Sequence, residues 1–275
     1  MAKLDGRIAI VTGAGRGVGR MIAAKLGGEG ARVIVNDLDS EPAEAVAGEI
    51  VSAGGDARAL AGDVTAPDFA DTLIALTLAQ FGDLHIVINN AGYIWNSAAL
   101  NHTDEQWQAM LDIHATAPFR ILRAAGRHFR DRARAAGAGS PPVCRKVVNV
   151  SSISGVWGAA TQASYAAGKA ALIGVTKALS KEWGRYNVTV NCVALGHIDT
   201  RLTQRLDEGP RTIAIGGRDY KVGLDPELHD TIRRLTPLGR TGTAEDAAGA
   251  VYLLCIPESD FVSGQVLIAS GGLVM

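Results

Sequence analysis

Tyr165 and Lys169 are the residues of this 275-residue chain whose types and spacing most clearly suggest catalysis. They stand four positions apart in the segment 164–169, so on a helix both side chains lie on one face. Ser152 ends a strand-like run thirteen positions before Tyr165, and a turn can bring its hydroxyl beside the phenol. Ser151 and Ser154 are alternatives for this serine, but their spacing fits less well.

A phenol, an ammonium and a hydroxyl together suit the interconversion of a carbonyl and an alcohol. Hydride transfer to a carbonyl leaves an alkoxide that needs a proton, and the reverse reaction needs a base. A tyrosine with a pKa of ~10 serves as that base near neutrality only if its pKa falls by about three units, roughly 4 kcal/mol. An ammonium about 4 Å away supplies on the order of 4 kcal/mol at an effective dielectric near 20. We therefore expect Lys169 to lower the pKa of Tyr165 and Ser152 to hydrogen-bond the substrate oxygen. In the alternative interpretation, Tyr165 only packs and Lys169 is solvated.

A second pattern is the glycine-rich segment 12–19, which follows the strand-like run Ile8–Val11 and precedes an amphipathic segment. Glycines let the backbone turn tightly against a pyrophosphate, and the helix N-terminus adds N–H donors and a favourable dipole. A glycine-rich loop without a ligand is the alternative, but the strand before it and the helix after it favour a dinucleotide site. The residues expected there are Gly13, Arg16, Gly17, Val18 and Gly19.

With its T-G-x-x-x-G-x-G turn and its Ser, Tyr-x-x-x-Lys set, the chain resembles the short-chain dehydrogenase/reductase family from Gly6 to Gly272. The resemblance implies a nicotinamide cofactor. Asp37 follows the second strand, where a carboxylate accepts the ribose hydroxyls and repels a 2′-phosphate, so NAD is expected rather than NADP. Arg16 argues the other way, since a basic residue in this turn can hold that phosphate.

The resemblance also assigns further cofactor contacts. Asp63 and Val64 match the pair that contacts adenine, and Asn90, Ala91 and Gly92 match the segment that ends the fourth strand. Lys169 would hold the nicotinamide ribose. The usual Pro-Gly after the sixth strand is Leu195-Gly196 here, and we still expect the Ile198 backbone and the Thr200 hydroxyl to hold the carboxamide.

His114 stands where many members of the family have an asparagine whose backbone carbonyl positions a water for proton relay. A role of the carbonyl survives this exchange, so we count His114 among the catalytic residues and expect altered relay or pH behaviour. A helix histidine that merely packs is an equally weighted alternative.

The elements around these residues alternate in a regular way. Strands are expected at Arg7–Val11, Arg32–Asn36, Ala57–Ala61, His85–Asn89, Lys146–Ser151, Val188–Val193 and Gln265–Ile268. Helices are expected at 18–28, 40–53, 66–81, 104–130, 164–184 and 244–256. Apolar strands that alternate with helices predict one α/β domain over 1–275, a doubly wound Rossmann-type fold with a parallel seven-stranded sheet and helices on both faces. Residues 131–144 suggest a surface loop, and 197–237 a substrate lid.

Composition excludes several classes of protein. A net charge of −1 argues against a nucleic-acid binder, and no apolar run reaches the length of a membrane span. Cys144, Cys192 and Cys255 form no C-x-x-C pair and suggest neither a disulfide framework nor a zinc site, so we expect reduced thiols, no metal and a cytoplasmic protein.

Substrate and partners are less well defined by the sequence. Among subfamilies the chain looks most like 3-oxoacyl-thioester reductases, and a histidine at this relay position also occurs in the 3-hydroxyacyl-CoA dehydrogenase branch. A basic stripe would dock an acidic carrier or CoA phosphates, or else be a solvated face or a subunit interface; it consists of Arg120, Arg123, Arg127, Arg130 and Arg134. The resemblance implies a homotetramer built on helices 104–130 and 164–184. A polyol, sugar or steroid-like alcohol substrate, a dehydratase or epimerase, and a catalytically silent dinucleotide sensor are the alternatives.

Overall fold

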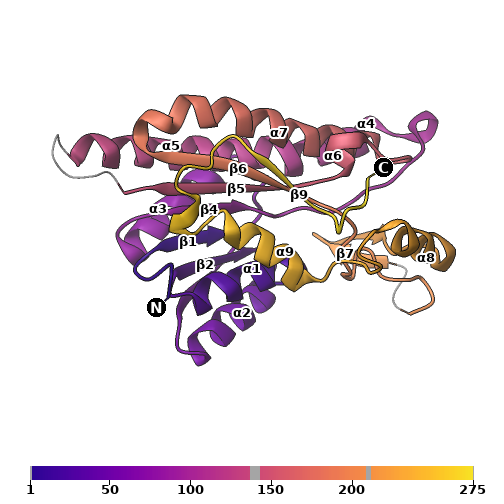
Figure 1. Ribbon diagram of the computed structural model, residues 1–275, viewed down its shortest axis with the longest axis horizontal. Helices are drawn as coiled ribbons and strands as arrows, with labels where there is room; N and C mark the ends of the chain where they lie inside the picture. Colours follow the sequence, from indigo (N-terminus) through magenta and orange to yellow (C-terminus); the bar gives the residue numbers. More distant parts are fainter. Residues whose placement is uncertain (1, 137–142, 209–211, 275) are drawn as a thin grey trace.

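The computed structural model describes residues 2–136, 143–208 and 212–274, and its centre is a seven-stranded parallel sheet in the order β3-β2-β1-β4-β5-β6-β9 (Figure 1). Each predicted strand is present within two residues of its expected bounds. The strands are β1 (Ile8–Val11), β2 (Arg32–Asp37), β3 (Asp56–Ala61), β4 (Ile86–Asn89), β5 (Arg145–Ser152), β6 (Val188–Leu195) and β9 (Val266–Ala269).

The chain adds strands outward from β1 to β3 and then returns to start the other half of the sheet at β4, directly beside β1. In such doubly wound sheets the crevice outside the carboxyl ends of the strands, at the point where the order reverses, is the usual ligand site. The predicted fold class is confirmed, and it directs attention to the loops that follow β1, β4, β5 and β6.

Helices cover both faces of the sheet, with α5 and α7 on one side and α1, α2 and α9 on the other (Figure 1). Ala9 and Val11 face the core under α1, α2 and α9, whereas Ile8 and Ile10 face the opposite core. Burial on both faces is why these strands are continuously apolar rather than alternating. The helices are α1 (Gly17–Gly28), α2 (Ser40–Ser52), α3 (Phe69–Phe81), α4 (Asp104–Leu111), α5 (Ala117–Ala135), α7 (Ala163–Trp183) and α9 (Ala244–Leu253).

The region predicted as one helix over 104–130 differs in two ways. A π-helical turn, Asp112–Thr116, separates α4 from α5, and α5 continues to Ala135, into the predicted loop 131–144. The extension is held by Arg132, whose guanidinium lies 3.1 Å from the Asp83 carboxylate. Residues 137–142 of that predicted loop lie outside the described residues. A short helix, α6 (Ser154–Trp157), was not predicted.

Residues 209–211 of the predicted lid, 197–237, lie outside the described residues, and the remainder contains a hairpin and a helix at the carboxyl end of the sheet (Figure 1). An antiparallel hairpin pairs β7 (Thr212–Ile215) with β8 (Arg218–Lys221), and α8 (Pro226–Leu235) follows. Gly216 and Gly217 form the hairpin turn with φ of +57° and +77°, which glycine adopts without steric cost. Within the described ranges, no helix combines the length and apolarity needed to cross a bilayer.

Candidate active site

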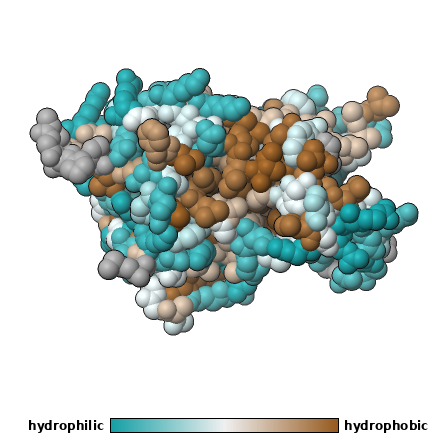
Figure 2. Space-filling view, viewed as in Figure 1, coloured by the Kyte–Doolittle hydropathy of each residue, from teal (hydrophilic) through white to brown (hydrophobic). Residues whose placement is uncertain are grey.

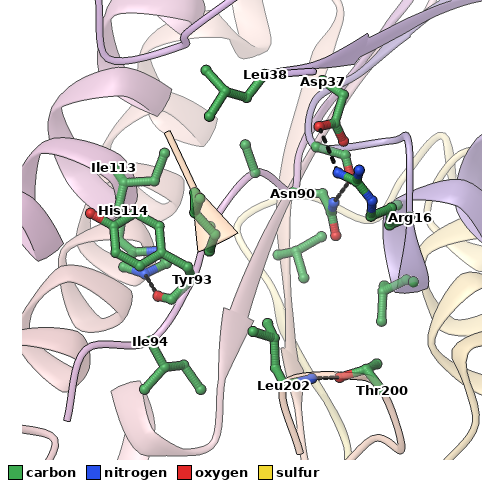
Figure 3. Close-up of a pocket in the computed structure, with 18 of the residues that line it drawn as sticks. Arg16, Asp37, Leu38, Asn90, Tyr93, Ile94, Ile113, His114, Thr200 and Leu202 are labelled. Carbon is green, nitrogen blue, oxygen red and sulfur yellow. Dashed lines mark hydrogen bonds and ion pairs between the residues drawn. The ribbon is translucent and has the colours of Figure 1, made fainter. Parts of the chain in front are cut away.

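A cavity of about 520 Å³ opens at the carboxyl ends of the strands, and every cofactor-binding and catalytic residue predicted from the sequence lines it. Figure 3 shows Arg16, Asp37 and Asn90 on one side of this cavity and Tyr93, Ile113 and His114 on the other. The predicted residues brought together are Gly13, Arg16, Gly17, Val18, Gly19, Asp37, Asp63, Val64, Asn90, Ala91, Gly92, His114, Ser152, Tyr165, Lys169, Gly196, Ile198 and Thr200.

The glycine turn is closed so tightly that side chains are excluded from it. A Cβ on Gly13 would lie 2.7 Å from the Ala91 Cα, and one on Gly19 would lie 2.0 Å from the Gly13 carbonyl oxygen. Helix α1 starts at Gly17 with no side-chain cap at Arg16 and no acidic residue in its first turn. Its first N–H groups are therefore available to an anion, and the turn fits the pyrophosphate of a dinucleotide.

Thr12 and Asn90 fasten this turn to the end of β4. The Asn90 side-chain amide donates to the carbonyl oxygens of Thr12 (2.9 Å) and Gly13 (3.1 Å). In return, the Thr12 hydroxyl oxygen accepts the backbone N–H groups of Asn90 (3.0 Å) and Ala91 (3.1 Å). The predicted Asn90–Gly92 segment thus acts as a support that fixes the turn before any ligand arrives.

At the far end of the cavity, Asp37 is half-buried and anchored. Its Oδ2 accepts the Gly15 backbone N–H at 2.8 Å, and a Cβ on Gly15 would lie 2.8 Å from that same oxygen. Arg16 is held mainly by Asp39, with 2.8 Å between Nη1 and Oδ2, and lies 3.9 Å from the nearer Asp37 oxygen. Arg201 also lines this end, and its pKa is lowered by burial and then by the nearby positive charge of Arg16.

The turn after β3, where adenine is expected, is also preorganised. One oxygen of the Asp63 carboxylate accepts both the backbone N–H (2.8 Å) and the hydroxyl (2.7 Å) of Thr65. These bonds hold the loop that presents Asp63 and Val64 to the cavity.

The proposed catalytic side chains meet at the opposite end, where β5 ends and α7 begins. The Lys169 Nζ donates to the Val150 carbonyl oxygen at 2.8 Å and lies 5.7 Å from the centre of the Tyr165 ring. Ser152, the last residue of β5, interacts through its hydroxyl with Tyr165. The alternative serines make structural bonds instead, with Ser151 donating to the Lys169 carbonyl (2.8 Å) and Ser154 to the Gln162 side chain (2.8 Å).

Burial governs the protonation of this group. It raises the pKa of Tyr165 to about 12, against the opposing effect of Ser152, and it lowers the pKa of Lys169 to about 8. The structure therefore differs from the expectation that Lys169 lowers the pKa of Tyr165. The ammonium is directed at the Val150 carbonyl, and a dry site disfavours phenolate and ammonium alike. In this arrangement Tyr165 is a neutral phenol with a proton to give.

His114 occupies the π-helical turn and is fully buried. Its ring packs edge-on against Tyr165 at a centroid distance of 5.0 Å, and its Nε2 lies 2.8 Å from the Tyr93 carbonyl oxygen. Burial first, and then the charge of Lys169, keep the pKa of His114 well below its usual range, so the ring is neutral. A Cβ on Gly92 would lie 2.4 Å from the ring, and one on Gly168 would lie 2.8 Å from the His114 Cβ.

The wall facing the catalytic group is aromatic, and the sequence analysis did not predict it. Tyr220 of the lid hairpin packs on Tyr93 and Trp95, with ring centroids 4.7 Å and 5.2 Å apart. Arg218 lies over the Trp95 ring and pairs with Glu105 of α4 at 2.7 Å. The alternation of Thr212–Tyr220 around a Gly-Gly pair was a signal for the hairpin, but nothing local indicated its docking site.

Comparison with known proteins decides the family. Residues 7–211 match the protein family described as short chain dehydrogenase. The chain belongs to the short-chain dehydrogenase family. It is 33% identical to a 3-oxoacyl-acyl-carrier-protein reductase of Synechocystis over 100% of both chains, and 31% identical to the reductase FabG of Escherichia coli over 98% of both. A crystal structure of a candidate short-chain alcohol dehydrogenase from Sinorhizobium meliloti superposes with a TM-score of 0.84, at 28% identity, over 98% of this chain and 97% of that one.

Membership and geometry agree on the general activity. This short-chain dehydrogenase is an NAD(P)-dependent oxidoreductase that acts on alcohol and ketone groups, as predicted from the sequence. The glycine turn, the carboxyl-end cavity and the Ser152, Tyr165 and Lys169 set are the parts of the structure that fit a nicotinamide dinucleotide beside a carbonyl substrate.

Proposed function

We propose that residues 1–275 form one domain that uses NAD to interconvert a 3-oxoacyl thioester and the corresponding 3-hydroxyacyl thioester, with 197–237 as the substrate lid. The observation that carries this proposal is that Ser152, Tyr165 and Lys169 share one cavity with the glycine turn and with an apolar wall.

The residues divide the work of reduction among themselves. The chemistry that a reduced nicotinamide would supply in this cavity is a hydride for the carbonyl carbon of the substrate. Ser152 donates a hydrogen bond to the substrate oxygen, and the neutral phenol of Tyr165 gives that oxygen its proton. Lys169 is held at the Val150 carbonyl. It would hydrogen-bond the ribose of the nicotinamide and would replace the proton of Tyr165. The π-helical turn at His114 departs from the regular i to i+4 bonding pattern, which suits a backbone carbonyl that binds a relay water.

NAD is favoured by the position of Asp37. Its carboxylate faces the cavity and is locked by the Gly15 N–H, while Arg16 is drawn toward Asp39. A 2′-phosphate would meet the fixed negative charge at close range. NADP is the second candidate, because Arg16 and Arg201 both line this end and could share a phosphate.

The thioester substrate is supported by two facts of different kinds. Several relatives at 31–34% identity are named 3-oxoacyl-acyl-carrier-protein reductases. Figure 3 shows Tyr93, Ile94 and Leu202 in the wall of the cavity, and Tyr220 also lines it. These side chains suit an acyl chain better than the hydroxyls of a polyol or sugar.

Initial rates with acetoacetyl-CoA, a steroid ketone and a polyol, each with NAD(H) and with NADP(H), test this proposal. We expect acetoacetyl-CoA reduction with kcat/KM at least about tenfold higher for NADH than for NADPH, near the worth of one good polar contact. Preference for NADPH contradicts the role of Asp37. Tight dinucleotide binding without turnover on any substrate leaves a silent sensor as the function.

The basic stripe on α5 supports docking of an acidic carrier only in part. Arg127 and Arg130 pair with Asp71 (3.2 Å) and Asp131 (2.9 Å), and Arg120 donates to the Thr65 carbonyl (2.8 Å). Arg123 and Arg134 are exposed and carry the remaining charge of the stripe. If a carrier docks here, reversing both to glutamate raises KM for acyl-carrier-protein substrates severalfold and leaves KM for a free thioester unchanged.

We also propose a cytoplasmic homotetramer. Apolar surface gathers over the edge strand β9 in the centre of the visible face, and its exposed members near α9 and β9 include Leu253, Phe261 and Ile268 (Figure 2). Such a patch usually marks an interface. Light scattering after gel filtration gives the mass, and Phe261→Glu is expected to reduce it if the patch is an interface.

A further inference from the structure

Three potential metal ligands converge where the chain leaves β6 and meets the lid. His197 and Asp199 flank Ile198 just after β6, and His229 projects from α8. Asp199 Oδ1 lies 3.5 Å from His197 Nε2 and 3.3 Å from His229 Nε2. The ligand atoms of the three residues all lie within 4.8 Å of one another. The sequence predicts no metal, an expectation that rests on the spacing of the cysteines alone. The residues of this cluster come from two segments separated by the hairpin, and no local motif links them.

The spacing is close to what a tetrahedral ion requires. Zinc bonds to histidine nitrogen and carboxylate oxygen are about 2.0–2.2 Å long, which places neighbouring ligand atoms roughly 3.3 Å apart. Both distances that involve Asp199 already match this edge. Only the two imidazoles have to approach each other, and their rings stand at 81° with centroids 5.3 Å apart.

Burial and bonding leave one ring nitrogen of each imidazole unsatisfied, while His229 Nε2 is hydrogen-bonded to Asp199 Oδ1 at 3.3 Å. Their side chains are 9% and 12% exposed, whereas that of Asp199 is 50% exposed. Among the described residues, neither His197 Nε2 nor His229 Nδ1 has a hydrogen-bond partner. A buried ring nitrogen without a hydrogen-bond partner destabilises the folded protein, and coordination of a metal by His197 Nε2 would remove this penalty for His197.

The surroundings resemble the outer contacts of a metal site. Thr241 donates its hydroxyl hydrogen to Asp199 Oδ2, leaving Oδ1 toward the imidazoles. Asp230 Oδ1 lies 3.8 Å from His229 Nδ1, beyond hydrogen-bond distance, and accepts a hydrogen bond from Arg205 Nη1 at 2.9 Å. Backbone bonds from Asp199 N–H to the Gly242 carbonyl (2.8 Å) and from Gly242 N–H to the His197 carbonyl (2.9 Å) fix the loop.

We propose that His197 Nε2, Asp199 Oδ1 and His229 Nε2 bind one divalent transition-metal ion, with zinc as the best chemical match and water at the fourth position. Two imidazoles and one carboxylate are the ligand set of several open zinc sites, and the exposure of Asp199 leaves room for water. The ion would tie α8 of the lid to the segment that continues to Ile198 and Thr200. This inference does not depend on the substrate or cofactor proposed above.

Metal binding to the full-length protein, stripped with EDTA and dialysed, tests the site directly. Calorimetric titration with Zn²⁺ gives the stoichiometry, and Co²⁺ titration followed by visible absorption reports coordination geometry. We expect one Zn²⁺ per chain with micromolar or tighter affinity, an intense absorption band of tetrahedral Co²⁺, and a rise of several degrees in Tm with metal.

Asp199→Asn and His229→Ala should each weaken Zn²⁺ binding by about tenfold or more and abolish the metal-dependent rise in Tm, in line with the loss of one ligand. His102→Ala removes a histidine outside the cluster and should leave both unchanged. Circular dichroism without metal establishes that each variant is folded. Sub-stoichiometric Zn²⁺ binding by the parent chain, an octahedral Co²⁺ spectrum, or equal binding by His229→Ala and the parent chain would each overturn the proposal.

Discussion

The two ends of the cavity are built on opposite physical principles. At the adenosine end, charged side chains are partly exposed and paired, with Arg16 between Asp37 and Asp39 and backbone N–H groups as the fixed donors. At the catalytic end, Lys169 and His114 are buried and Tyr165 is half-buried, and the pKa values of all three are displaced toward the neutral form.

The contrast shows what each end has to do. Recognition of a charged, hydrated ligand needs geometry and matched charge, and solvent screening there limits each contact to modest energies. Proton transfer needs groups whose charge states are nearly balanced, and burial sets that balance because it penalises both phenolate and ammonium. A substitution at the buried, catalytic end should therefore alter kcat. A substitution at the more exposed end near Asp37, called the wet end below, should alter the affinity for the dinucleotide.

Tyr165→Phe is expected to produce the largest effect. Loss of the phenol that we propose as the proton donor to the substrate oxygen should lower kcat by about 10³-fold, within the range of general acid catalysis. The Kd for NADH, measured by fluorescence, should stay within about twofold, because packing of the ring is kept. Tyr186→Phe is the matched control. A loss of NADH affinity as large as the loss of kcat would contradict the division of roles.

Lys169→Met tests whether burial lowers the pKa of Lys169 in the folded protein. The pKa of Lys169 is lowered to about 8 from an ordinary 10.5, so the unfolded chain binds more protons between these values. The free energy of unfolding should therefore rise with pH across this window in the parent protein, by on the order of 3 kcal/mol from this group. Denaturant unfolding at pH 8 and 10 should show a smaller rise in the variant. An equal rise in the free energy of unfolding in the parent protein and the variant would show that Lys169 is not the source of this pH dependence.

Asp37→Ala probes the wet end, where we expect about a tenfold loss of NAD affinity and little change in kcat at saturating cofactor. Affinity for NADP should fall less or increase, since the repelling charge is gone. Asp39→Ala serves as a control, because that residue binds Arg16 but makes no such contact with Gly15. Equal losses of NAD affinity in both variants would show that general charge, and not the placement of Asp37, selects the cofactor.

Tyr220→Ala should have the smallest effect and sharpen the boundary between the two ends. Removing this ring exposes Tyr93 and Trp95, so KM for a thioester should rise about fivefold, roughly 1 kcal/mol, as expected for a lost aromatic contact. The NADH Kd should not change. Lys221→Ala, at the exposed neighbouring position, is the control, and a similar KM in both variants would remove Tyr220 from the substrate wall.

Local sequence signals were sufficient for the sheet and for the cofactor end. Strand, glycine turn and helix follow one another within residues 8–28, so the hydrophobic pattern and the glycine spacing that predict them both involve neighbouring residues. The Tyr165 and Lys169 pair is also local, because one helical turn joins them.

The parts that sequence did not predict depend on contacts between distant segments. The packing of Tyr220 on Tyr93 is a tertiary contact that leaves no periodic signal in the sequence. The π-helical turn, Asp112–Thr116, is a short irregularity inside a helical pattern. The direction of the Tyr165 pKa was missed because distance arguments counted the charge of Lys169 but not the removal of water. The extension of α5 depends on the ion pair between Arg132 and Asp83. Helix propensities do not predict a contact with a residue so distant in the sequence.

The fit of His114 between Gly92 and Gly168 makes this corner of the site intolerant of added volume. A methyl group on Gly92 would collide with the imidazole itself, so alanine there forces the ring to move. A methyl group on Gly168 would collide with the His114 Cβ, a contact that every residue other than glycine at 114 would also make. Available space, as well as chemistry, therefore restricts which side chains these three positions can hold together.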